Sequence, residues 1–236
     1  MTETSEALQN LFHQYSSLSL GGKEIVCPYW MNKLVQGIYG PNGGKGNPEQ
    51  IVQATVEEAK NAFFDLNKAS EEEILAFMRT RRIGVDCSGF VYWMLDAFDR
   101  EKGGNGLADD IPEANGSFVG SRANVRLLTS KELATRVSLQ DVRVGDMIRT
   151  RGGKHIMIVF SIDRDDDGNL WKITYAHSSN KTEIIGVHLG VIDIVAPEKT
   201  LADQIWQEKN ADGDSYLVDF LPEAGDGFYR LLLFNK

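Results

Sequence analysis

The stretch DCSGFVYWMLDAF at residues 86–98 decides the fold, because it places a reactive side chain at the start of a helix. Its apolar residues, other than the aromatic pair in its middle, are Phe90, Val91, Met94, Leu95 and Phe98. They recur at the spacing of one face of a core-facing helix. The pattern therefore predicts a helix that begins at or just after Cys87.

A helix N-terminus is a favourable place for a nucleophilic cysteine. The unpaired N–H groups and the positive end of the helix dipole stabilise a thiolate, so we expect the pKa of Cys87 to lie below the ~8.5 of a free thiol. Asp86 is expected to cap the helix, and its charge opposes that ionisation. The backbone N–H groups of Cys87 and Ser88 could hold an oxyanion, and Gly89 allows another segment to approach the first turn. The alternative is a small buried core thiol.

Length and composition are those of a globular protein. The chain has 236 residues, a net charge of −9 and 42% hydrophobic residues. This acidity argues against a nucleic-acid partner, which needs a basic surface, and suits a neutral or cationic substrate. Two cysteines, Cys27 and Cys87, do not make a disulfide framework, and we expect Cys27 to be a buried thiol. Neither a secretory signal nor a membrane span is predicted.

The order of the predicted elements indicates an α+β fold with an antiparallel sheet. Helices are expected near residues 8–15, from 49 to about 79 with a break at 67–70, and after Cys87. Asn47 and Ser70 have the sequence context of N-caps. Residues 101–120 form a loop-rich insertion, and from Val142 onward short strands follow one another through hairpins. We expect residues 1–80 to be an extension packed on a catalytic domain of residues 81–236, the two forming one globular unit.

Two of the four histidines are predicted to lie side by side. His155 opens one strand, His177 lies near the end of the next, and a turn-forming run DDDGN separates the strands. A hairpin centred near Asp166 makes the two histidines direct cross-strand neighbours on one face. A base bonded to a thiol, and a polar group that orients the base, are what cysteine catalysis requires. We therefore assign His155 as base and His177 as the orienting residue.

These motifs together resemble the NlpC/P60 family of papain-like cysteine peptidases. The resemblance rests on Asp-Cys-Ser-Gly-Phe-Val at 86–91, Val-Gly-Asp-Met at 144–147, His-Ile-Met-Ile at 155–158 and Ala-His-Ser at 176–178. It implies Cys87 as nucleophile, His155 as base and His177 as third member, with no cofactor and no metal. It also implies hydrolysis of peptidoglycan stem peptides, commonly between D-γ-glutamate and a diamino acid, by a protein that acts outside the cytoplasm.

The family's Tyr and Gly-Gly turn do not stand directly before this cysteine. We expect Tyr39 and the Gly-Gly-Lys-Gly loop at 43–46 to be that element, displaced by the helices of residues 49–79. Tyr39 and Trp93 are candidates for lining the substrate groove, although aromatic residues of this kind more often pack in a core.

Three other functions stay open at the level of sequence. The chain could be a non-catalytic wall-binding or interaction module on the same fold. It could instead be an amidase that cuts the sugar–peptide bond, or an acyltransferase with the same triad. A zinc site made by Cys87, His155 and His177 is the weaker interpretation of these residues, because no CxxC or HExxH spacing accompanies them.

Overall fold

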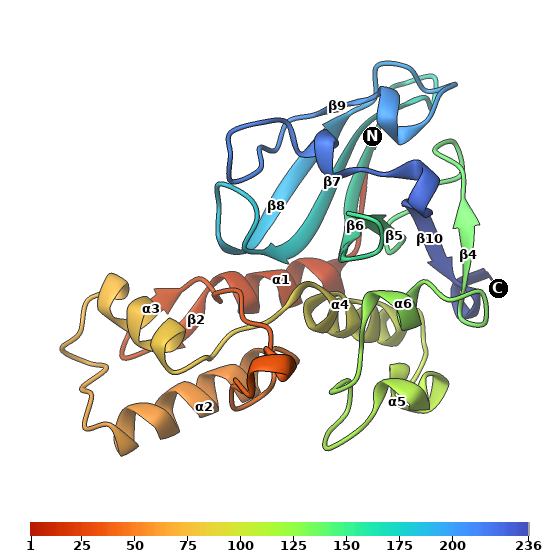
Figure 1. The fold of residues 1–236 in the computed structure, drawn as a ribbon. Coiled ribbons are helices and arrows are strands. Elements are labelled where there is room, and N and C mark those ends of the chain that lie inside the picture. The colour runs from red at the N-terminus through yellow and green to blue at the C-terminus, as the bar shows by residue number, and fades with distance from the viewer. Residues whose placement is uncertain (236) are drawn as a thin grey trace.

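A computed structural model describes residues 1–235 and has two layers, helices below and a sheet above (Figure 1). The helical layer contains α1 (Glu6–Ser16), α2 (Pro48–Asn61), α3 (Glu71–Thr80) and α4 (Cys87–Glu101). The short helices α5 (Leu107–Asp110) and α6 (Val125–Leu128) lie at its edge. The fold is thus α+β, as the sequence predicts.

Local sequence signals fix where the helices begin. Asn47 and Ser70 each make the expected capping box, with Gln50 and Glu73 as the residues that bond back to the cap. Each box satisfies two N–H groups that a helix start leaves unpaired. The short helix α6 is capped by Asn124, whose side-chain oxygen accepts a hydrogen bond from the N–H of Leu127.

The sheet has eight strands in the order β4-β10-β5-β6-β7-β8-β9, with β1 paired to β6 beside this path. Their bounds are β1 (Thr2–Thr4), β4 (Ala134–Val137), β5 (Met147–Thr150), β6 (His155–Arg164), β7 (Leu170–Ser179), β8 (Gly186–Asp193), β9 (Ile205–Trp206) and β10 (Gly227–Leu231). All these pairs are antiparallel. A separate hairpin joins β2 (Leu18–Leu20) to β3 (Lys23–Ile25).

The two faces of the sheet are covered by different parts of the chain. Ile156 and Ile158 of β6 pack with Phe90 of α4 in a core that also contains Leu8 of α1. The intervening residue Met157 points to the opposite face and joins a second core with Trp206 and Tyr216. The alternation of side chains along β6 therefore places the histidines of this strand pair on the face covered by the C-terminal segments.

The first 80 residues are built into the same body as the rest. β1 pairs with the C-terminal half of β6, where Glu3 lies opposite Ile162. One continuous core contains both Ile51 of α2 and Leu95 of α4. Removing the N-terminal segment would expose buried apolar surface of α4, at roughly 25 cal/mol per Å².

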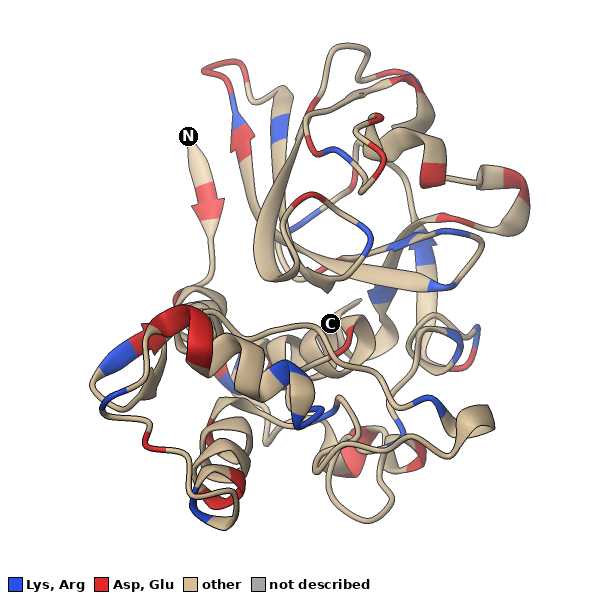
Figure 2. Cartoon of the chain, turned by 60° about the vertical axis from the view of Figure 1, so that its left-hand side comes forward, with Lys and Arg blue, Asp and Glu red and all other residues tan. Residues whose placement is uncertain are grey.

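Residues 101–120 are more ordered than the sequence suggested. They contain α5 and a 3-10 turn, Pro112–Ala114, and Leu107, Ile111 and Ala114 are fully buried. Lys and Arg are spread over both layers and interspersed with Asp and Glu (Figure 2). In the described residues, every helix falls short of the length and hydrophobicity needed to cross a bilayer.

Candidate active site

Cys87 is the first residue of α4, where the sequence placed it. Asp86 caps the helix, and its Oδ1 accepts a hydrogen bond of 2.8 Å from the N–H of Gly89. The thiol is 5% exposed, and both Cys87 and Cys27 are free cysteines. The predicted position and cap of the nucleophile candidate are therefore confirmed.

The glycine-rich loop packs directly on this helix start. A Cβ at Gly89 would lie 2.5 Å from the carbonyl oxygen of Gly44, so only glycine allows the approach. The same carbonyl accepts a 2.8 Å bond from the N–H of Asp86. Trp93 donates from its indole to the carbonyl oxygen of Lys45 at 2.7 Å. Trp93 thus anchors the loop, and it is not among the residues that line the cleft in front of Cys87.

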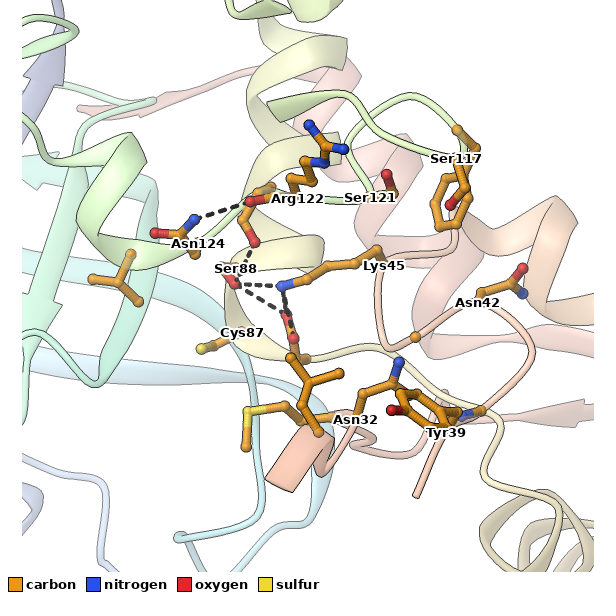
Figure 3. A pocket seen from close by; sticks show the side chains of 18 of the residues that line it. Asn32, Tyr39, Asn42, Lys45, Cys87, Ser88, Ser117, Ser121, Arg122 and Asn124 are labelled. Atoms are coloured by element: carbon orange, nitrogen blue, oxygen red, sulfur yellow. Dashed lines mark hydrogen bonds and ion pairs between the residues drawn. The ribbon is translucent and has the colours of Figure 1, made fainter. Parts of the chain in front are cut away.

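Lys45 occupies the centre of a small ionic network beside the cysteine (Figure 3). Its ammonium lies 2.7 Å from a carboxylate oxygen of Asp86 and 2.7 Å from the hydroxyl of Ser88. Ser88 also bonds to the carbonyl of Ala123, so its hydroxyl is committed to structure. In Figure 3 the sulfur of Cys87 points away from this network. Lys45 therefore neutralises the capping carboxylate and does not contact the thiol.

The thiol is held neutral, which corrects the prediction of a lowered pKa. Burial, and then the charge of Asp86, raise the pKa of Cys87 to about 12, and Lys45 only partly offsets them. Hydrogen bonds from the backbone N–H groups of Ile156 and Ser88 act in the opposite direction and place two donors at the sulfur. Desolvation at this helix start outweighs the stabilisation of a thiolate by helix N–H groups.

His155 and His177 lie in contact, as predicted from the sequence, but the register of their two strands differs from the predicted one. Nε2 of His155 lies 2.9 Å from Nδ1 of His177, and both rings are buried. Ile158 faces Ala176 rather than Thr174, so the two histidines are diagonal and not direct cross-strand neighbours. A shift of two residues keeps both side chains on one face, whereas a shift of one would separate them.

Three residues beyond these histidines continue the hydrogen-bonded chain, and none of them was predicted from the sequence to belong to the site. Oε1 of Glu208 lies 3.0 Å from Nε2 of His177 and 2.6 Å from Nε2 of His188. Tyr175 donates its hydroxyl to the other carboxylate oxygen of Glu208. Glu208 follows β9, and His188 lies directly opposite His177 on β8.

Burial favours neutral imidazoles at His155 and His177. Burial lowers the pKa of His155 well below its usual value, and a charge on His177 would lower it further. Burial also lowers the pKa of His177, although Glu208 acts against it. Burial by itself would raise the pKa of Glu208, but His177 and the hydrogen bonds that it accepts hold the carboxyl ionised. The carboxylate is thus the fixed charge of the cluster.

A cleft of about 900 Å³ opens in front of Cys87. Tyr39 lines it, as expected, and is 55% exposed at its rim. Tyr29, by contrast, lies close enough to Cys87 that a thiolate there would raise the pKa of the tyrosine hydroxyl. Tyr29 is therefore a second aromatic residue near the nucleophile, and the equivalence of Tyr39 to the family's tyrosine stays a prediction.

The charges around the cleft differ from the charge of the whole chain. Its lining contains one acidic residue, Asp86, and four basic ones, Lys45, Arg122, Arg126 and Lys154. Asp86 is already paired with Lys45. The free charges at the cleft are thus positive, and this local balance favours an anionic substrate over the neutral or cationic one inferred from net charge.

Comparison of the chain with protein-family models, curated proteins and solved structures found no match. The assignment of chemistry therefore rests on the geometry described above.

Proposed function

We propose that this protein is a cysteine hydrolase of amide bonds, with the papain-like arrangement of the NlpC/P60 family. The observation that carries the proposal is the 2.9 Å contact between Nε2 of His155 and Nδ1 of His177, in a chain that also has a cysteine at the start of α4. This contact occupies one ring nitrogen of His155. It leaves Nδ1 for the thiol, which has the backbone N–H of Ile156 as a hydrogen-bond donor.

Proton positions along the chain support His155 as a general base. Glu208 accepts from Nε2–H of His177, so the Nδ1 of a neutral His177 has a lone pair. That lone pair accepts Nε2–H of His155, and Nδ1 of His155 is then unprotonated. His177 thus selects the tautomer of the base, as the carboxylate does in a Ser-His-Asp triad.

The reaction begins from a neutral pair. Because the pKa of Cys87 is raised to about 12, we propose that His155 removes the thiol proton while the sulfur attacks the amide carbonyl. We assign the developing oxyanion to the backbone N–H groups at the start of α4, those of Cys87 and Ser88. Protonated His155 then gives its proton to the leaving amine, the thioester forms, and water activated by the same imidazole hydrolyses it.

The substrate class follows from the charges of the cleft and from the family resemblance. The unpaired basic side chains at the cleft suit an amide substrate that carries carboxylates. A peptidoglycan stem peptide is such a substrate, and the resemblance favours the bond between D-γ-glutamate and a diamino acid. Cleavage of the sugar–peptide amide, or transfer of the acyl group to another amine, would use the same residues.

Mass spectrometry of soluble products from purified wall fragments tests the proposal. We expect new amine and carboxyl termini within the stem peptide for the wild type and none for Cys87→Ser. The termini identify the bond. Intact fragments after prolonged incubation with the wild type would instead favour a binding module, and equal products from Cys87→Ser would remove Cys87 from the reaction.

A further inference from the structure

We propose that His177, His188 and Glu208 form a binding site for a divalent first-row transition metal ion. Nε2 of His177, Nε2 of His188 and Oε1 of Glu208 lie within 2.6–3.0 Å of one another. Both imidazoles are buried, and the carboxylate side chain is 9% exposed. Two imidazoles and a carboxylate on one side of an ion are a common ligand set for zinc and for iron.

Hydrogen bonding within the protein does not satisfy this cluster. Three mutual contacts need three protons between their atoms, but each Nε2 carries at most one, and the ionised carboxylate carries none. At least one of the three contacts therefore joins two groups with no proton between them. A cation in front of the three atoms attracts all of them at once.

The dimensions of the triangle fit a metal ion. Ligand atoms that lie about 2.1 Å from an ion, at right angles to one another, are separated by about 3 Å. The observed separations of 2.6, 2.8 and 3.0 Å approach this value, so the three atoms match one face of an octahedron. Three further positions on the ion would remain for water.

Each of the three ligand residues also contacts a second group through its other polar atom, as metal ligands in proteins commonly do. Nδ1 of His188 lies 3.0 Å from the carbonyl oxygen of Gly186, and Tyr175 bonds the second oxygen of Glu208. Nδ1 of His177 contacts His155. Such partners orient the ligands and typically change metal affinity by 10- to 100-fold.

A second pocket provides a path to the site. It has a volume of about 250 Å³ and is lined by His188 and Glu208 together with Leu189, Gln207 and Lys209. It shares no lining residue with the cleft at Cys87. An ion can therefore reach the cluster without passing through the substrate cleft.

The ion would control the base, a consequence that rests on the proposed function. With a metal on its Nε2, neutral His177 carries its proton on Nδ1 and donates it to Nε2 of His155. His155 then carries its own proton on Nδ1, the nitrogen that must receive the thiol proton. The metal-loaded protein is thus a hydrolase whose base is switched off, and removal of the ion restores the active tautomer.

Calorimetric titration of the metal-free protein with ZnCl2 tests the site. We expect one equivalent of Zn²⁺ to bind the wild type and Cys87→Ser alike, and at least tenfold weaker binding by His188→Gln and by Glu208→Gln. His13→Gln removes an exposed histidine on α1 and serves as the matched control with unchanged affinity. Equal affinity in His188→Gln and wild type, or loss of binding in Cys87→Ser, would overturn the site.

Two further measurements do not depend on the folding of a ligand variant. X-ray absorption of the zinc-loaded wild type should show nitrogen and oxygen ligands, including imidazole, and a sulfur ligand would overturn the assignment. In the wall-fragment assay, Zn²⁺ should inhibit the wild type, and a chelator should reverse this. Zinc bound at the site without inhibition would overturn the regulatory role, whereas a metal-free protein with no hydrolysis contradicts the proposed function and leaves the metal site standing.

Discussion

Nε2 of His155 and Nδ1 of His177 lie 2.9 Å apart, although the residues are diagonal and not opposite across their hairpin. The contact ties the tautomer of one ring to the proton of the other. In the proposed mechanism His177 is a positioning residue, because it would act on the thiol only through His155.

Replacing His177 tests that role. In His177→Leu, His155 loses the acceptor for its Nε2–H, so we expect kcat to fall by about 10²–10⁴ with little change in KM. His177→Gln can place an amide oxygen near the same donor and should recover part of the loss. The comparison is made in steady-state hydrolysis of purified stem peptides, with circular dichroism to verify folding. Equal losses in both variants would indicate a structural role alone.

The ionisation of Cys87 can be measured by alkylation. Because its pKa is raised to about 12, the rate of reaction with iodoacetamide should rise about tenfold per pH unit from pH 7 to 10, without a plateau. Cys27→Ser removes the other thiol, whose pKa is also raised by burial. The readout is peptide mass spectrometry of residues 83–100. A plateau below pH 8 would show that a thiolate–imidazolium pair exists in the resting protein.

Lys45 and Asp86 form a largely buried ion pair at the cleft, with side chains 13% and 4% exposed. Lys45→Met leaves the Asp86 carboxylate without its countercharge, and we expect a loss of about 2–4 kcal/mol in the free energy of unfolding. The double variant Lys45→Met/Asp86→Asn removes the unpaired charge and should recover part of that loss. Urea denaturation of the wild type, Lys45→Met, Asp86→Asn and the double variant gives the coupling energy. Additive losses would show that the pair contributes no interaction.

Arg122 lies at the cleft and is exposed. If the substrate carries a carboxylate, Arg122→Gln should raise KM several-fold and leave kcat within about twofold, because the change removes ground-state attraction. The effect should shrink as salt is raised to 0.5 M. Lys131→Gln, on an exposed lysine that is not among the residues lining the cleft, is the matched control. Identical KM values for both variants would argue against an anionic substrate.

Features set by short segments could be predicted from the sequence. The capping boxes at Asn47 and Ser70 and the start of the helix at Cys87 depend on residues within a few positions of one another. Local hydrogen bonding and side-chain periodicity determine such features wherever the segment lies.

Features set by long-range pairing could not be predicted. The pairing of Arg164 with Leu170 centres the histidine hairpin on Asp167 rather than Asp166, and the two one-residue irregularities along the hairpin cancel. Glu208 reaches His177 only because β9 pairs with β8. The position of His188 could have been predicted, because a second hairpin between residues 179 and 186 places it opposite His177. The raised pKa of Cys87 likewise depends on burial by distant segments.

Intact-protein mass spectrometry after rapid quenching tests the central claim most directly. With purified stem peptides as substrate, we expect a transient mass increase equal to the acyl portion, mapped to the peptide that contains Cys87, which decays as products form. His155→Ala should form this thioester at least a hundredfold more slowly. Product release by the wild type with no adduct on Cys87, and at the same rate in Cys87→Ala, would contradict the account.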